Sequence, residues 1–440
     1  MKNLIFYLIS LIFILAFGGG ILEIYGINPN VTQLIIDFLI MMVFSYSLLN
    51  IIKNKKIKGP GLAVNFFLFA TILISFLVTN VSELQMILFI RKFGIYYLFF
   101  YALLNINLNV VQKKKLLKLL MFLFLVQIPA AMIKLITIGT MEDYIGIISI
   151  QQGSIASIIP LMAISYLIAR YLEFKNNKYL VLILLFISIG LISSKIAILF
   201  YLMILFVVLS YFYSLKHTKG FSLINLIFIK KMMAVSVILI LIFLSFISLN
   251  PRTNPEHKVG GSVDIDFLQN YVMEYQTAQF QGGKIEAGGR FDAPGVAVER
   301  LSEGGLLNLL IGFGPGDIVK SSYSTYKDPL LEKYSIGYGG RLGFIWILIQ
   351  IGIIGVIVFV LFHIYLFTRV LTFYHAENDR ESQVLILTVL GISIIYFLDF
   401  FTYSSTMLKS SSAAISYYFA MFYVFSDNIE ATNSYNKLST

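Results

Sequence analysis

Long apolar runs follow one another along almost the whole chain, separated by short polar segments. A helix needs about 20 mostly apolar residues to cross the hydrocarbon core of a bilayer. Such runs recur at residues 4–20, 31–52, 62–80, 84–104, 116–138, 154–173, 179–193, 195–213, 232–250, 342–370, 384–403 and 411–426. The pattern predicts an all-α polytopic membrane protein with about twelve transmembrane helices.

One long segment, residues 251–341, is too polar to lie in lipid, and it divides the chain. Residues 1–250 are predicted to form an N-terminal transmembrane bundle of about nine helices. Residues 342–427 form the C-terminal transmembrane helices, and residues 428–440 form a polar tail. Inside the long segment, Asp292 followed by Pro294 is typical of the start of a helix, which is predicted to end at Gly304.

Basic side chains gather in alternate polar segments, at Lys2, Lys175, Lys178 and residues 53–58, 113–115, 216–231 and 369–380. If the spans simply alternate, all of these segments fall on one side of the membrane. Cytoplasmic loops are enriched in Lys and Arg, so this side is predicted to be the cytoplasm. Both termini are then cytoplasmic, and residues 251–341 form a large extracytoplasmic loop. Trp346, the only tryptophan, is expected to anchor the tenth span at the membrane interface.

Composition agrees with this interpretation and excludes several classes of site. The 440 residues are 58% hydrophobic and 13% charged, with a mean hydropathy of +0.85. The net charge of +10 is explained by the topology-setting basic residues, so no nucleic-acid partner is expected. Without cysteine, the chain has no disulfide, zinc–thiolate site or cysteine nucleophile. The N-terminal run resembles a signal peptide but lacks a small-residue cleavage site, so we expect it to stay as the first span.

Six charged residues interrupt the predicted spans. An unpaired charge at the centre of a spanning helix costs about 2.5–3.5 kcal/mol by insertion scales. In the predicted topology all six lie in the outer half of their helices: Asp37, Arg91, Lys92, Lys134, Lys195 and Asp399. They either pair with one another and reach towards the interface, or they line a polar cavity that opens to the outer leaflet.

Four motifs occur in a fixed order between residues 140 and 360. An amide-bearing, glycine-containing segment at residues 146–156 precedes the sixth span, and Ser193-Ser194-Lys195 lies between the seventh and eighth. Gly289-Arg290 is followed by a glycine run at residues 312–316, and residues 348–355 contain Gln350, Gly352 and Gly355. This order resembles the O-antigen and capsular polysaccharide polymerase/ligase superfamily, which includes the Wzy-type polymerases.

The resemblance implies a GT-C-like glycosyltransferase architecture in the bacterial plasma (inner) membrane. It implies transfer of a growing glycan from undecaprenyl pyrophosphate to a lipid-linked repeat unit at the outer face. The expected partners are these lipid-linked glycans, the bilayer and a chain-length regulator, and no cofactor is expected. The ligases of the family are expected to carry a histidine shortly before the post-loop helix. Residues 334–338 contain none, which favours a polymerase.

Cations and carboxylates near the outer face are the candidate site residues. A pyrophosphate leaving group needs cationic, preferably bidentate donors, and the candidates are Arg290, Arg300, Arg91, Lys195 and Arg341. The alternative for Arg290 and Arg300 is a surface salt bridge to Asp292 or Glu303. The candidate bases for the acceptor hydroxyl are Asp292 and Glu299, followed by Glu286 and His257. No metal site is expected, although Asp264 and Asp266 could coordinate a cation.

Three other functions compete with the polymerase. The nearest is an O-antigen-type ligase, which moves the finished glycan onto another acceptor. A flippase or transporter of lipid-linked oligosaccharides is expected to have charges in both leaflets and matched internal repeats, and the sequence has neither. The third alternative is a non-catalytic partner in polysaccharide export.

Overall fold

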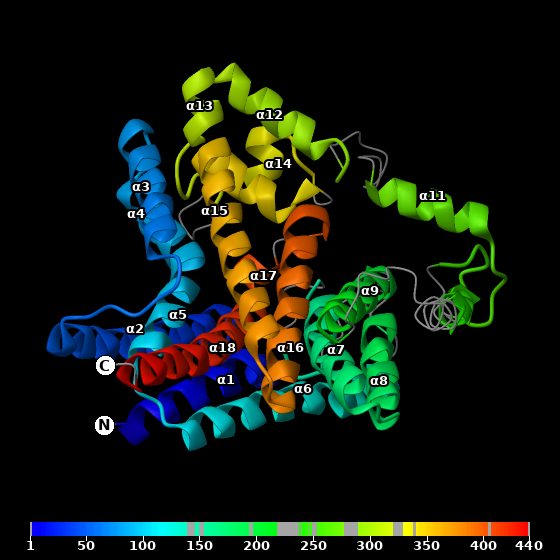
Figure 1. Ribbon diagram of the computed structural model, residues 1–440. Helices are drawn as coiled ribbons and strands as arrows, with labels where there is room; N and C mark the ends of the chain where they lie inside the picture. The colour runs from blue at the N-terminus through cyan, green and yellow to red at the C-terminus, as the bar shows by residue number, and fades with distance from the viewer. Residues whose placement is uncertain are drawn as a thin grey trace.

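The computed structural model describes residues 2–138, 146–148, 154–192, 197–217, 237–238, 240–245, 247–248, 253–276, 289–319, 329–337, 340–403 and 406–438. All regular elements in these ranges are helices (Figure 1). They are α1 (Lys2–Ile24), α2 (Pro29–Asn54), α3 (Leu62–Val78), α4 (Glu83–Phe89), η1 (Ile90–Gly94), α5 (Ile95–Asn105), α6 (Val110–Ile138), α7 (Ile155–Phe174), α8 (Lys178–Ile192), α9 (Ala197–His217), α11 (Ile265–Gln276), α12 (Ala293–Glu303), α13 (Leu306–Ile311), α14 (Pro329–Tyr334), α15 (Gly343–Ala376), α16 (Arg380–Leu398), η3 (Asp399–Tyr403), α17 (Thr406–Lys409) and α18 (Ser411–Leu438).

Within the described ranges, eight helices are long and apolar enough to cross a membrane, so the chain is a polytopic, all-helical membrane protein as predicted. They are Asn3–Ile24, Pro29–Asn54, Glu83–Asn105, Val110–Lys134, Ile155–Phe174, Ile198–His217, Gly343–Ala376 and Arg380–Thr402. The predicted spans at 62–80 and 179–193 coincide with the shorter apolar helices α3 and α8. The span at 411–426 is the first part of α18, and the span at 232–250 lies partly outside the described residues. The count of twelve stays a prediction.

The centre of the molecule is an aromatic core around α15 and α16, which pack against each other (Figure 1). His363 of α15 stacks on Tyr396 of α16, with ring centroids 4.5 Å apart, and also contacts Phe359 at 4.4 Å. Tyr396 in turn lies 4.7 Å from Tyr417 of α18. All four side chains are almost fully buried, and aromatic burial of this size dominates the packing energy of a core.

The basic ends of two helices, α7 and α9, meet the connection between α15 and α16 at one end of this bundle. Arg170, near the end of α7, pairs with Glu381 at the start of α16 at 2.6 Å. Lys216, near the end of α9, donates hydrogen bonds to the carbonyl oxygens of Tyr374 and Glu377 after α15. We call this the basic end. Its existence agrees with simple alternation of the spans, whereas the side of the membrane that it faces stays a prediction.

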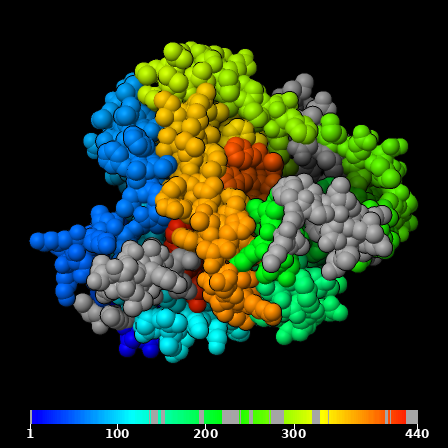
Figure 2. All heavy atoms as spheres, in the orientation of Figure 1, coloured from blue at the N-terminus to red at the C-terminus, as the bar shows by residue number. Residues whose placement is uncertain are grey.

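The helices α12, α13 and α14 lie at the opposite end, which we call the loop end (Figures 1 and 2). Both α12 and α13 pack on the first turns of α15, and α12 also contacts α14. The predicted helix after Asp292 is α12, with Pro294 in its first turn and Gly304 after its end. Asp292 occupies the N-cap position but its side chain forms no capping hydrogen bond.

The expectation that Trp346 anchors the tenth span at the membrane interface is wrong. Trp346 lies in the first turn of α15 but is only 4% exposed. Its ring stacks on Phe89 at a centroid distance of 5.5 Å and on Phe93 at 6.4 Å. These residues belong to α4 and η1, so the tryptophan joins them to α15 instead of facing the headgroups.

Candidate functional site

A break in α15 organises the loop end. Ile351 and Gly352 have non-helical backbone angles, with φ of −130° and +68°. The preceding carbonyl groups therefore accept hydrogen bonds from another segment: the amide of Phe313 donates to Ile349 at 2.8 Å, and the amide of Gly314 donates to Gln350 at 3.1 Å. The glycine run of the loop is thus inserted into the broken helix.

Two buried polar side chains complete this contact. Gln350 is fully buried; its Oε1 accepts from the amide of Gly316 at 3.0 Å and its Nε2 donates to the Trp346 carbonyl at 2.8 Å. Ser75 of α3 donates to the carbonyl of Ile311 at 2.7 Å. The contact therefore joins α3, the loop and α15, and we call residues 312–316 together with Gln350 and Gly352 the glycine junction.

Each glycine of the junction has a backbone conformation that other residues rarely adopt. Gly312, Gly314, Gly316 and Gly352 have φ of +81°, +115°, +96° and +68°. A β-carbon at Gly316 would also overlap the carbonyl oxygen of Gln85, and one at Gly314 would overlap Val81. Since the amides of Phe313, Gly314 and Gly316 are bonded to α15, the glycine run is a structural junction and not a phosphate-binding loop.

The residues of the junction and the one that follows it hold α14 in place. Asp317 pairs with Lys333 of α14 at 2.7 Å and accepts a hydrogen bond from the hydroxyl of Tyr334. Phe313 stacks on Tyr334 with ring centroids 5.1 Å apart. These contacts hold the segment before α15 against the junction.

Two π-helical segments converge beneath the loop end. They are η1, which contains Arg91 and Lys92, and η3, which begins at Asp399. The short helix α17 contacts both segments, and the amide of Met407 donates to the Asp399 carboxylate at 2.9 Å. Single-turn π segments are rare and occur frequently at functional sites. The sequence did not predict that the two segments meet, although each contains a charged residue within an apolar span.

Arg91 is held by an ion pair with Asp37 of α2. The Nε of Arg91 donates to Asp37 Oδ2 at 2.6 Å, and Gln33 donates to Oδ1 of the same carboxylate at 2.7 Å. This confirms mutual pairing for two of the six charges in the spans. The pairing reduces the cost of burying both charges. The Arg91 side chain is still 32% exposed, so it remains accessible to an anionic ligand.

Arg341 and Arg290 are two of the half-buried cations of the loop end. Arg341 directly precedes α15, whose first residue, Gly343, packs closely on Phe400 of η3. Burial lowers the pKa of Arg341 from its usual value, but an arginine remains protonated at neutral pH even so. Arg290 lies in the turn that leads into α12, which packs on α15.

The remaining predicted residues differ in their surroundings. Arg300 donates to both carboxylate oxygens of Glu303 at 3.0 Å, which is the surface salt bridge considered as its alternative. Asp292 and Glu299 are exposed on α12. Lys195, and Glu286 among the further bases, lie outside the described residues. The pyrophosphate-binding and base roles of all these residues stay predictions.

Among the described residues, no group of three or more His, Asp or Glu side chains lies close enough together to hold a metal ion. Asp264 accepts a hydrogen bond from the amide of Phe267 at 2.9 Å, so it acts in the first turn of α11. The polar cavity that the six charges were expected to line stays a prediction. One of the six, Lys134, has Glu23 as a charged neighbour.

No family model matches the chain, and no curated protein matches it. Evidence on function therefore comes from the residues themselves and from their arrangement at the loop end.

Proposed function

We propose that the protein is a polysaccharide polymerase of the O-antigen, capsule or exopolysaccharide type. It transfers a growing glycan from undecaprenyl pyrophosphate to a lipid-linked repeat unit at the outer face of the bacterial plasma membrane. The observation that carries this proposal is the glycine junction, which fastens the arginine-bearing loop to α15 and α3. A polar loop held firmly on a membrane bundle suits a substrate with a lipid anchor and a polar, anionic head.

The reaction exchanges one bond at the anomeric carbon of the donor glycan. The acceptor hydroxyl oxygen forms a bond to this carbon, while the bond from the carbon to the pyrophosphate oxygen breaks. Undecaprenyl pyrophosphate leaves with the bonding electron pair. Donors aimed at the developing negative charge contribute most to such a step, and the half-buried Arg290 and Arg341 are the first candidates for this role. The planar guanidinium group matches phosphate oxygens in a bidentate manner.

The hydroxyl proton needs an acceptor, and the candidates are Asp292 and Glu299. Both carboxylates are exposed on α12, and Asp292 is two residues from Arg290. Arg91 and Lys195 are secondary candidates, which would bind the pyrophosphate from the membrane side of the site. We expect a smaller contribution from Arg300, because its side chain is 39% exposed and lies on the surface of α12 beside Glu303.

The first test is Arg290→Ala in cells that depend on this protein for their surface glycan. Loss of one donor to a developing charge typically lowers the rate by about 10²–10³. We expect long-chain polymer to disappear while the amount of protein in the membrane is unchanged. Chain length is measured by gel electrophoresis of the glycan.

Arg369→Ala is the matched control, because Arg369 is exposed on the later part of α15, far along the helix from the loop end. It is expected to leave chain length unchanged, and Arg300→Ala is expected to shorten chains only slightly. Wild-type chain length in Arg290→Ala would contradict the pyrophosphate role of Arg290. A deletion strain separates the functions: a missing polymerase leaves single repeat units attached, a missing ligase leaves unattached polymer, and a missing flippase leaves no surface glycan.

A further inference from the structure

Helix α12 lies at the outer surface of the loop end (Figures 1 and 2). Its inner face is formed by Ala293, Ala297 and Leu301, which are fully buried and follow one another at intervals of four residues. The turn before the helix winds in the same way, because the amide of Ala293 donates to the carbonyl of Gly289 at 2.9 Å. Successive residues of an α-helix are rotated by about 100°, so the buried row also fixes which side chains share the opposite face. The exposed residues on that face form three rows.

The two outer rows of this face differ in chemistry. Phe291 and Val298 are seven residues apart, so they lie two turns apart along one edge of the face, and they are 66% and 42% exposed. Asp292 and Glu299 have the same spacing and lie along the other edge, where both are exposed. The Asp292 side chain forms no capping hydrogen bond. One edge therefore offers apolar surface, and the other offers carboxylates, which accept hydrogen bonds when ionised.

The middle row is low, and it begins at Gly295. Glycine inside a helix is destabilising relative to alanine. A β-carbon at Gly295 would enter open space, with no atom of the described chain within 4 Å, so no packing there requires a glycine. Glycine also allows a ligand to approach the backbone closely. The row continues at Ser302, whose small side chain is bonded back to the carbonyl of Val298 at 2.8 Å.

The three rows together form a shallow depression, which we call the α12 trough; it consists of Phe291, Asp292, Gly295, Val298, Glu299 and Ser302. The trough suits a sugar ring. The face of such a ring carries C–H groups, which are attracted to the negative face of an aromatic ring, and its hydroxyl groups donate hydrogen bonds to carboxylates. A purely apolar or an anionic ligand fits less well, because carboxylates line one edge.

We propose that the α12 trough binds the glycan of the lipid-linked repeat unit. One sugar ring lies against Phe291 and over Gly295, and its hydroxyl groups meet Asp292 and Glu299. This inference rests on the proposed function and adds a sugar-binding surface beside the arginines that bind the pyrophosphate. It also gives a reason for glycine at position 295, which the packing of the chain does not supply.

The test measures the binding of a soluble glycan to the full chain, purified in detergent. The probe is the repeat-unit oligosaccharide, released without its lipid from the surface glycan of the cells that make it, and titration calorimetry gives its dissociation constant. Phe291→Leu keeps an apolar side chain but removes the ring, and we expect about fivefold weaker binding. Phe291→Tyr is expected to bind like the wild-type protein. Gly295→Leu fills the trough and is expected to abolish binding, with an unchanged or higher unfolding temperature.

Two controls match these variants. Phe66→Leu makes the same exchange at a 72% exposed position near the start of α3, and Gln269→Leu adds a leucine to an exposed position of α11. Both are expected to bind the glycan like the wild-type protein.

Polymerisation is measured on the same preparations, so that the two proposals can fail separately. A wild-type protein that binds the glycan without polymerising it, with binding weakened in both trough variants, would support the trough and contradict the polymerase. A wild-type protein that binds no glycan would overturn the trough. Folded Phe291→Leu and Gly295→Leu variants that bind as tightly as the wild-type protein would also overturn it, whether or not the protein polymerises.

Discussion

The ion pair between Arg91 and Asp37 reduces the free-energy cost of placing two charges in apolar helices. They are 54 positions apart in the chain, yet their side chains meet at 2.6 Å. Each charge alone would cost about 2.5–3.5 kcal/mol at the centre of a span. The sequence predicted that both charges lie in the outer half of their helices, but pairing was one of two alternatives. Whether the two side chains meet depends on how α2 and η1 are rotated about their axes. The spacing of apolar residues does not specify this rotation.

A double-mutant cycle separates the structural and functional roles of this pair. Arg91→Ala leaves the largely buried Asp37 carboxylate without its cation, and an uncompensated buried charge is destabilising. We predict that Arg91→Ala lowers the thermal unfolding temperature more than the combination of Arg91→Ala with Asp37→Ala does. Unfolding in detergent provides the measurement. Strictly additive effects of the two substitutions would contradict an energetic coupling between them.

At the scale of elements, the glycine junction is where sequence reasoning was incomplete. The sequence identified the glycine run at residues 312–316 as a motif, but it did not show which residues the run contacts. The deciding partners are Ser75 and the carbonyl groups before Gly352, which are remote in sequence. Helix α12 was easier to predict, because Asp292, Pro294 and Gly304 are local signals.

Gly316→Ala tests the junction as a structural element. A left-handed backbone costs about 1–2 kcal/mol for a residue with a β-carbon, and the methyl group would also overlap Gln85. We predict a lower unfolding temperature and faster proteolysis of the loop. Gly295→Ala is the control, since Gly295 lies in α12 with open space around it and should be neutral or stabilising. Equal unfolding temperatures for the two variants would show that the junction does not hold the loop.

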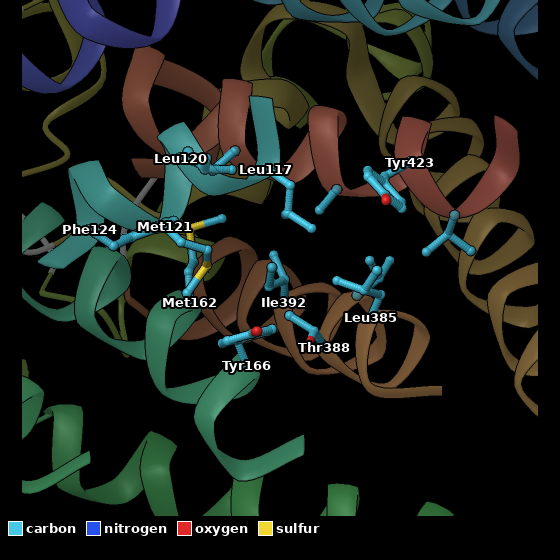
Figure 3. Close-up of a pocket in the computed structure, with 14 residues that line it drawn as sticks. Leu117, Leu120, Met121, Phe124, Met162, Tyr166, Leu385, Thr388, Ile392 and Tyr423 are labelled. Atoms are coloured by element: carbon cyan, nitrogen blue, oxygen red, sulfur yellow. The ribbon is translucent and has the colours of Figure 1, made fainter. Parts of the chain in front are cut away.

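At the scale of the whole molecule, the sequence predicted an all-helical, polytopic membrane protein, and the eight apolar helices in the described ranges confirm this class. The class follows from composition and from the length of the apolar runs. A small apolar cavity between α6, α7, α16 and α18 was not predicted, because its lining residues extend from Leu117 to Val424 (Figure 3). The convergence of η1, η3 and α17 was missed for the same reason: packing between distant helices leaves no periodic signal in any one of them.

The most direct test of the proposed function is polymerisation by the purified protein in lipid vesicles. The only substrate supplied is the repeat unit linked to undecaprenyl pyrophosphate. We predict a ladder of lengthened glycans, release of undecaprenyl pyrophosphate, and a rate about 10²–10³ lower for Arg290→Ala. Repeat units that stay unextended by the folded wild-type protein, or that move only across the membrane or onto a different acceptor, would contradict a polymerase.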